Sequence, residues 1–164
     1  MKIKIHVFHT GTVGVDPAVP FRDTSKNPIA YMGIFQNPKR RIWLPVSAYL
    51  IEHPKGRVLV DTEWHRDVRT NPKKHMSWKL HFVSKAKFPK GETIDEQLLK
   101  LGIKPQDLDY VFLSHMDVDH VSGVSLVKDA KQILISKEEL DAVNKGEIRY
   151  YNRLFKDVNI DTFE

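Results

Sequence analysis

Hydrophobic residues along the chain follow two different spacings, and these predict alternating strands and helices. The segment Met1–Phe8 alternates polar and apolar residues, which is typical of a half-buried strand. Trp43–Glu52 and Arg57–Asp61 carry denser apolar runs and are joined through His53–Gly56, a turn that contains proline and glycine. These two runs therefore predict two strands of one hairpin.

The second half of the chain alternates further strands with helices. Asp109–Leu113 and Lys131–Ile135 are short apolar runs that predict buried strands. Thr93–Gly102 opens with a capping-box pattern and ends in glycine, and Ser136–Gly146 opens with a serine three positions before a glutamate, so both predict helices. Tyr150–Phe155 is compatible with a helix or a loop. The succession of elements indicates the α/β (α+β) class.

Composition is consistent with one soluble domain over residues 1–164. The chain is 41% hydrophobic, which is enough to bury a core, and it has no internal repeat or low-complexity segment. Its start lacks the continuous apolar stretch of a signal peptide, and the longest apolar run, Trp43–Ile51, is too short to span a bilayer. We therefore expect a cytoplasmic protein. The absence of cysteine excludes disulfides and thiolate ligands.

Positive charge is concentrated in one segment. The net charge is +5, and Arg66–Lys90 alone contains eight lysines or arginines against a single acidic residue. Trp78, Phe82 and Phe88 interleave with these cations, a pattern that admits nucleic-acid or membrane-surface binding. A solvated face of an amphipathic segment is the interpretation we favour. Its inward-facing residues would be Met76, Leu80 and Val83.

The densest chemistry lies in Ser114–Gly123, which reads SHMDVDHVSG. It places His115, Asp117, Asp119 and His120 directly after a predicted buried strand, where functional loops are common. Imidazole and carboxylate suit zinc, iron or manganese, whereas calcium prefers more oxygen ligands. We expect these four side chains to converge on one divalent-metal site.

The motif resembles the H-x-H-x-D-H signature of the metallo-β-lactamase superfamily. A second anchor in the right order is Val58–Thr62, a strand that ends in Asp-Thr, as an earlier strand of that family does. Leu44–Ile51 and Pro105–Tyr110 are similar to the N-acyl homoserine lactonase branch. The resemblance implies an αββα sandwich, of which this chain supplies the N-terminal portion, namely the first sheet and its helices.

Three departures from the family pattern stand out. Asp117 replaces the second histidine, which favours harder ions such as iron or manganese over zinc. Glu63 replaces the glycine that usually follows Asp-Thr, so we expect a close backbone approach there to be lost or relaxed. The family also requires metal ligands well downstream, and no histidine follows His120.

The resemblance implies a metal-dependent hydrolase of a lactone, ester or related carbonyl compound, in which two cations activate a water molecule. By position, His115 and Asp117 would serve one metal, and Asp119 and His120 the other. Asp119 would also orient the nucleophile and pass its proton to the leaving oxygen. Asp61 would orient the motif loop from outside the metal shell. Zinc is the first expectation for the cofactor and a small molecule for the substrate.

The incomplete ligand set leads to further expectations. The chain alone should bind metal weakly and be inactive, and its exposed sheet should be covered by a missing C-terminal half or, second, by a homodimer. A non-catalytic truncated remnant or interaction module and a nucleic-acid processing member of the superfamily remain alternatives. The basic segment could also attract a substrate. Outside the motif, histidines are interpreted as ordinary surface or core residues, His65 being nearest the expected site. The others are His6, His9, His53, His75 and His81.

Overall fold

The computed structural model describes residues 2–21, 38–146 and 149–164, whose strands form one seven-stranded sheet. The strands are β1 (Lys4–Val15), β2 (Ile42–His53), β3 (Gly56–Val60), β4 (Lys85–Lys87), β5 (Tyr110–Phe112), β6 (Gln132–Ser136) and β7 (Asp161–Phe163). The α-helices are α1 (Arg66–Thr70), α2 (Pro72–His75), α3 (Trp78–Val83), α4 (Ile94–Lys100), α5 (Val118–Val121) and α6 (Lys137–Asn144). Short 3₁₀ turns cover Pro38–Arg40, Pro105–Asp107, Val124–Val127 and Asn152–Leu154.

The sheet is mixed, with strand order β4-β1-β2-β3-β5-β6-β7. Strands β4, β1, β2 and β3 pair antiparallel, and β3, β5, β6 and β7 pair parallel. The predicted hairpin is confirmed, since Tyr49 of β2 lies opposite Val60 of β3. Strand β1 is longer than predicted and continues past Phe8 to Val15. Parallel pairing places the ends of β3 and β5 at the same edge of the sheet, where the motif follows.

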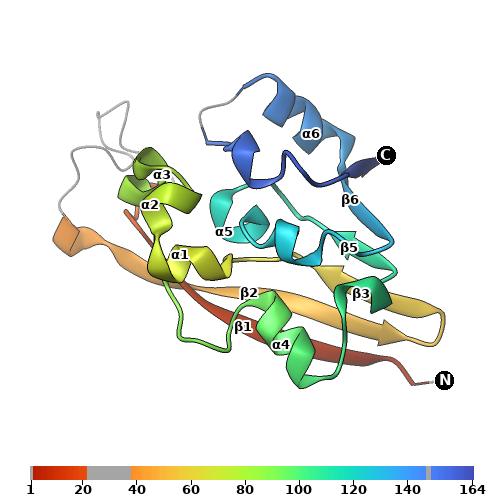
Figure 1. Ribbon diagram of the computed structural model, residues 1–164. Coiled ribbons are helices and arrows are strands. Elements are labelled where there is room, and N and C mark those ends of the chain that lie inside the picture. The colour runs from red at the N-terminus through yellow and green to blue at the C-terminus, as the bar shows by residue number, and fades with distance from the viewer. Residues whose placement is uncertain (1, 22–37, 147–148) are drawn as a thin grey trace.

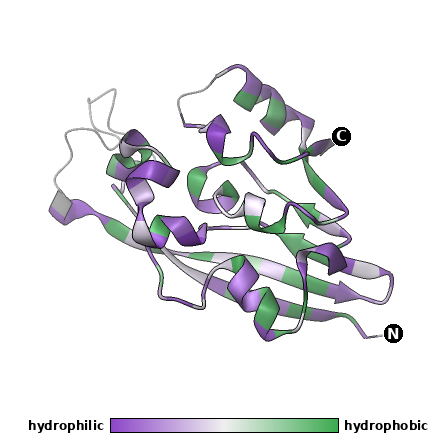
Figure 2. Cartoon of the chain, in the orientation of Figure 1, coloured by the Kyte–Doolittle hydropathy of each residue, from purple (hydrophilic) through white to green (hydrophobic). Residues whose placement is uncertain are grey.

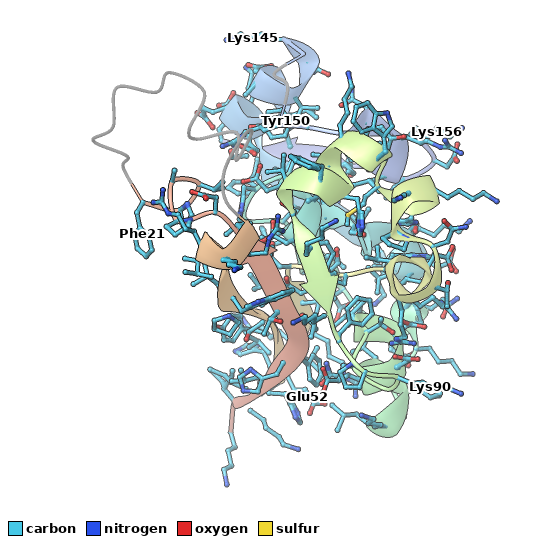
Figure 3. All side chains as sticks on the ribbon, turned by 90° about the vertical axis from the view of Figure 1, so that its left-hand side faces the viewer. Phe21, Glu52, Lys90, Lys145, Tyr150 and Lys156 are labelled. Carbon is cyan, nitrogen blue, oxygen red and sulfur yellow. The ribbon has the colours of Figure 1, made fainter. Side chains whose placement is uncertain are left out.

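One face of the sheet carries the core. Leu50, Leu59, Val111 and Ile133 lie opposite one another across four neighbouring strands and are almost completely buried. Helices α1 to α5 lie on this side (Figure 1), and in the side view they stand to the right of β1 and β2 (Figure 3). Each fully buried aliphatic side chain stabilises the fold by about 1.5–3 kcal/mol. Their partners in the same cluster include Trp64, Ile94, Leu98 and Val121.

The opposite face of the sheet is apolar but exposed. Val7 lies opposite Tyr49, and Tyr49 lies opposite Val60, so these residues share the face that the core residues do not use. Hydrophobic and hydrophilic positions alternate along β1 and β2 (Figure 2). We call this surface the open face. Its exposed large side chains include Ile5, Val7, Tyr49, Tyr110 and Phe163.

The two predicted helix starts are confirmed, together with their predicted caps. Ser136 Oγ accepts from the backbone N–H of Glu139 at 3.2 Å and begins α6. At α4, Glu96 Oε2 accepts from Thr93 N at 3.1 Å, as in a capping box. The Thr93 hydroxyl, however, donates to Asp95 Oδ1 at 2.7 Å. Both halves of the reciprocal box are formed nonetheless, because a hydroxyl that donates to Asp95 can also accept from the backbone N–H of Glu96.

The basic segment folds into three short helices, α1 to α3, followed by β4. The expected inward face is confirmed for Met76, which is fully buried. Trp78 and Phe82 are exposed, whereas Phe88 is buried, so only two of the three interleaved aromatic residues face solvent. No helix in the described part of the chain combines the length and apolar character needed to cross a membrane.

Candidate metal centre

Asp61 connects the ends of β3 and β5. It follows β3 with a left-handed backbone (φ 63°), and its N–H donates to Phe112 O at 2.8 Å. Its carboxylate accepts from the backbone N–H and the hydroxyl of Ser114, both at 2.7 Å. Asp61 Oδ2 also lies 3.0 Å from His120 Nδ1. The buried carboxylate therefore fixes both the start of the motif and the ring of its last histidine.

The motif itself turns into α5. Asp117 O accepts from His120 N at 2.9 Å, so this helix begins directly after Asp117, the first carboxylate of the motif. His120 O in turn accepts from the backbone N–H groups of Thr62 and Glu63 at 3.1 and 2.9 Å. Gly123 N donates to Glu63 O at 2.6 Å. The loop after β3 and helix α5 are thereby joined backbone to backbone.

The motif side chains lie in two pairs, an outer pair of His115 with Asp117 and an inner pair of Asp119 with His120. The two histidine rings are in contact. His115 Nε2 is 3.4 Å from Asp117 Oδ2, and His120 Nε2 is 3.8 Å from Asp119 Oδ2. The rings of the two histidines have centroids 4.0 Å apart. Nitrogen and carboxylate oxygen donors suit zinc, iron and manganese, and each pair offers two donors to one ion. Among the residues described, His120 is the one motif residue in a group of three convergent donors, and its partners there are Asp61 and Glu63 rather than His115, Asp117 or Asp119.

The guanidinium group of Arg149 lies beside the outer pair. Arg149 Nε is 3.5 Å from Asp117 Oδ1, and Arg149 Nη2 donates to Glu139 Oε1 at 3.2 Å. Glu139 Oε1 also accepts from Met116 N at 2.9 Å and from the Tyr150 hydroxyl at 3.0 Å. Tyr150 is labelled in Figure 3. Glu139 therefore fixes Arg149 against the motif.

Burial, hydrogen bonds and neighbouring charges shift the pKa values of His120 and Asp61. Burial alone lowers the pKa of His120, but the Asp61 hydrogen bond and the carboxylates of Glu63 and Asp119 outweigh it and raise the pKa to about 9. Burial raises the pKa of Asp61, yet hydrogen bonds from His120 and Ser114 outweigh it and leave the pKa below its ordinary value. His120 Nδ1 thus donates to Asp61, which leaves Nε2 facing Asp119.

Comparison with known proteins agrees with this architecture. Residues 41–161 match the family model described as the metallo-beta-lactamase superfamily, which is most of the chain. The chain belongs to the metallo-β-lactamase superfamily. The predicted fold class is likewise confirmed, because the chain matches, over its whole length, 61% of a solved N-acyl homoserine lactone hydrolase with N-hexanoyl-L-homoserine bound at its metal centre (TM-score 0.76, 21% identity).

Curated relatives in the superfamily are lactonases. The N-acyl homoserine lactonase AttM of Azorhizobium caulinodans is 32% identical over 98 residues, which are 58% of this chain and 36% of that protein. An N-acyl homoserine lactonase of Bacillus cereus is 29% identical over 110 residues, which are 67% of this chain and 44% of that protein. The dizinc lactonase AidC matches 99% of this chain and 58% of its own (TM-score 0.57, 17% identity). The match therefore covers less than half of each of these two curated relatives.

The expectation for Glu63, where the superfamily pattern has glycine, is wrong. Its backbone adopts the left-handed region (φ 57°), and its N–H and C=O keep the close contacts to His120 and Gly123. A Cβ at Gly123 would lie only 2.3 Å from Thr62 O. The approach is preserved because glutamate accepts the strained backbone and glycine on the partner segment leaves the space.

The Glu63 side chain is a site residue that the sequence did not reveal. It is fully buried, and neither carboxylate oxygen has a hydrogen-bond partner. Its Oε1 is 3.8 Å from His120 Nδ1. Burial raises its pKa to about 9, although the charge of His120 opposes the shift. Arg149 and Glu139 were also missed, and the only signal for Glu63 was its departure from the family pattern.

Two histidines expected to be ordinary form a second group. The rings of His65 and His75 stack with centroids 4.4 Å apart and planes 13° from parallel. His65 Nδ1 is 3.6 Å from Asp67 Oδ2. Burial and the neighbouring His75 lower the pKa of His65 to about 4, and burial also lowers the pKa of His75. Both rings are therefore neutral at pH 7.

Proposed function

We propose that this chain is the N-terminal, metal-ligating portion of a metal-dependent hydrolase that acts on a lactone, an ester or a related carbonyl compound. The observation that carries the proposal is the pairing of His115 with Asp117 and of Asp119 with His120 at the ends of β3 and β5. The named lactonase relatives support an N-acyl homoserine lactone as the first substrate to test.

Each motif residue has a proposed role. His115 and Asp117 would hold one divalent ion, and Asp119 and His120 the other. When bound, such ions supply a water nucleophile near neutral pH. Asp119 would orient that water and move a proton to the leaving oxygen. Asp61 would keep His120 Nε2 directed at the site through the hydrogen bond on the opposite ring nitrogen.

The metal identity follows from the donors. Two imidazoles and two carboxylates fit zinc, which we propose first, and the extra oxygen from Asp117 fits iron or manganese as well. Two donors per ion are fewer than a tetrahedral shell needs. We therefore expect weak metal binding by these 164 residues and stronger binding once further ligands are supplied.

The open face is the second support for an incomplete unit. Exposing about 500 Å² of apolar surface forgoes roughly 12 kcal/mol at about 25 cal/mol per Å², which is comparable with the stability of a whole domain. Patches of this kind mark interfaces. We propose that a further part of the same fold covers it, with a second copy of the chain as the alternative. The cytoplasmic location stays a prediction.

The test compares this chain with the longest product that its reading frame encodes. We expect hydrolysis of an N-acyl homoserine lactone only in a version that carries the additional ligands, measured with added zinc. In that version Asp119→Ala should reduce turnover by about 10²-fold or more, whereas Asp141→Ala, on exposed α6, should not.

Two outcomes would count against the proposal. Turnover by the 164 residues alone, abolished by Asp119→Ala, would mean that the site is complete without further ligands. A metal-loaded longer product without any hydrolytic turnover would favour the non-catalytic alternative. Salt-dependent binding of RNA or DNA would instead point to a nucleic-acid processing enzyme.

A further inference from the structure

His65, Asp67 and His75 form a compact donor group outside the motif. Each offers one ligand atom, and these atoms all lie within 4.8 Å of one another. His65 precedes the first residue of α1, Asp67 lies in the first turn of that helix, and His75 ends α2. The helices α1 and α2 are joined through Asn71 and lie next to each other (Figure 1), so the three residues come from one short stretch of chain.

The hydroxyl group of Ser122 contacts both histidines. Ser122 Oγ lies 3.1 Å from His75 Nε2 and accepts from the backbone N–H of His65 at 3.2 Å. When His75 Nε2–H donates to this hydroxyl, its Nδ1 lone pair is free for a cation. Metal-binding histidines in proteins usually have the second ring nitrogen hydrogen-bonded in this way.

His65 contributes through Nδ1, the nitrogen nearest Asp67. That nitrogen accepts from Asp67 N at 3.1 Å, at the start of a five-residue helix. An ion between His65 and Asp67 would replace this bond with a stronger contact. Because both imidazoles are neutral at pH 7, no proton needs to leave them before they bind a cation.

A cavity gives two members of the group, Asp67 and His75, access to water. It has a volume of about 360 Å³ and is lined by Asp67 and His75, together with Ser125 and Asp157. It can therefore hold the waters that complete a coordination shell. Lys74 and Arg153 also line it, and their charges oppose a bound cation. We expect a site that exchanges its ion with solvent, unlike a closed structural zinc site.

We propose that His65, Asp67 and His75 form a second divalent-cation site, separate from the His115–His120 motif, that takes zinc or a similar ion such as cobalt(II). Two nitrogens and one carboxylate oxygen are a donor set that zinc commonly uses, with water in the remaining position. This site is independent of hydrolase activity, because its donors lie on α1, on its N-cap and on α2, outside the motif.

The experiment is a zinc titration of the ¹⁵N-labelled chain, followed through the ring nitrogens of individual histidines by NMR. We expect the ring signals of His65 and His75 to shift and to saturate with a single ion, independently of His115 and His120. Asp67→Asn should weaken zinc binding at this site by at least about tenfold, because even loss of an outer contact costs about 10- to 100-fold. It should leave the motif signals unchanged.

The matched control is Asp157→Asn, which removes the same charge from the same cavity without touching the donor group. Equal weakening by the two variants would reduce the effect to general electrostatics and overturn the proposal. So would His65 and His75 signals that stay fixed while zinc saturates the motif. If Asp67→Asn disturbs the backbone spectrum, His75→Gln, with His53→Gln as its control, provides the same comparison through the His65 ring.

Discussion

Two groups of residues at the candidate site differ in what balances their charges, and we call them the inner half and the outer half. In the inner half, Asp61, Glu63 and His120 are largely buried and interact with one another. In the outer half, His115 and Asp117 are partly exposed, and Arg149 stands beside the carboxylate. The inner half therefore belongs to the fold, because its groups are largely shielded from solvent and must be balanced by one another. In the outer half, the partly exposed Asp117 is balanced by Arg149 instead.

The sharpest test of this contrast removes one carboxylate from each half. Asp61→Asn keeps the left-handed backbone preference but removes the charge that His120 faces, and we expect the free energy of unfolding to fall by about 3 kcal/mol. Asp117→Asn removes the same charge from the partly exposed half and should change it by no more than about 0.5 kcal/mol. Urea denaturation at pH 7 with chelator measures both. Equal losses would mean that the two halves are equally structural.

Raising the pH toward 9 should progressively lower the free energy of unfolding through Glu63 and His120 of the inner half. The pKa values of Glu63 and His120 are raised to about 9, from ordinary values of 4.5 and 6.5. Between the unfolded and folded pKa of each group the native state holds the additional proton, so stability is present at lower pH and is lost as pH rises toward 9. For each group the slope is at most about 1.4 kcal/mol per pH unit.

Glu63→Gln isolates one of these contributions. Glutamine resembles the protonated acid, so the variant should match the wild type near pH 5 and become the more stable protein as pH approaches 9. The measurement is the free energy of unfolding against pH, again with chelator present. Glu138→Gln, at an exposed position of α6, is the control. Parallel curves for wild type and Glu63→Gln would show that Glu63 is ionised in the folded protein.

Arg149 in the outer half should have a modest effect on metal affinity. Arg149→Gln removes the cation beside Asp117, so metal should bind more tightly at the motif, by up to about fivefold, as a half-exposed charge interaction of about 1 kcal/mol allows. Calorimetric zinc titration measures the change, and Arg57→Gln, at the distant β2–β3 turn, is the control. Unchanged or weaker zinc binding would mean that Arg149 supports the position of Asp117 more than it competes with metal.

Local patterns predicted the strands β2, β3, β5 and β6 and the helices α4 and α6, whereas β4 and β7 were not predicted. The turn at His53–Gly56, the cap at Ser136 and the glycine after α4 each depend on residues close in sequence, and the structure forms all three. The strand that precedes the motif was also predicted, because an apolar run followed by polar ligands is a local signal. The capping box of α4 was predicted as well, because Thr93 and Glu96 lie only three positions apart in the sequence.

The missed features all depend on contacts between segments far apart in the chain. Nothing near Asp117 indicates that Arg149 will stand beside it, and nothing near His75 indicates that Ser122 will hold its ring. The close approach at Glu63 survives for a similar reason, because the space is provided by Gly123 on another segment. Such contacts are decided by how the strands order themselves in the sheet, and a single sequence does not state that order.

At Gly123, the available space rather than the backbone conformation limits which amino acids are tolerated. Its backbone angles (φ −86°, ψ −1°) are open to any amino acid, so conformational preference alone would permit substitution. The carbonyl of Thr62 nevertheless occupies the place of a side chain. In a saturation library of this chain, position 123 should therefore reject alanine as firmly as it rejects tryptophan, because the first added carbon already separates α5 from the loop that orients His120.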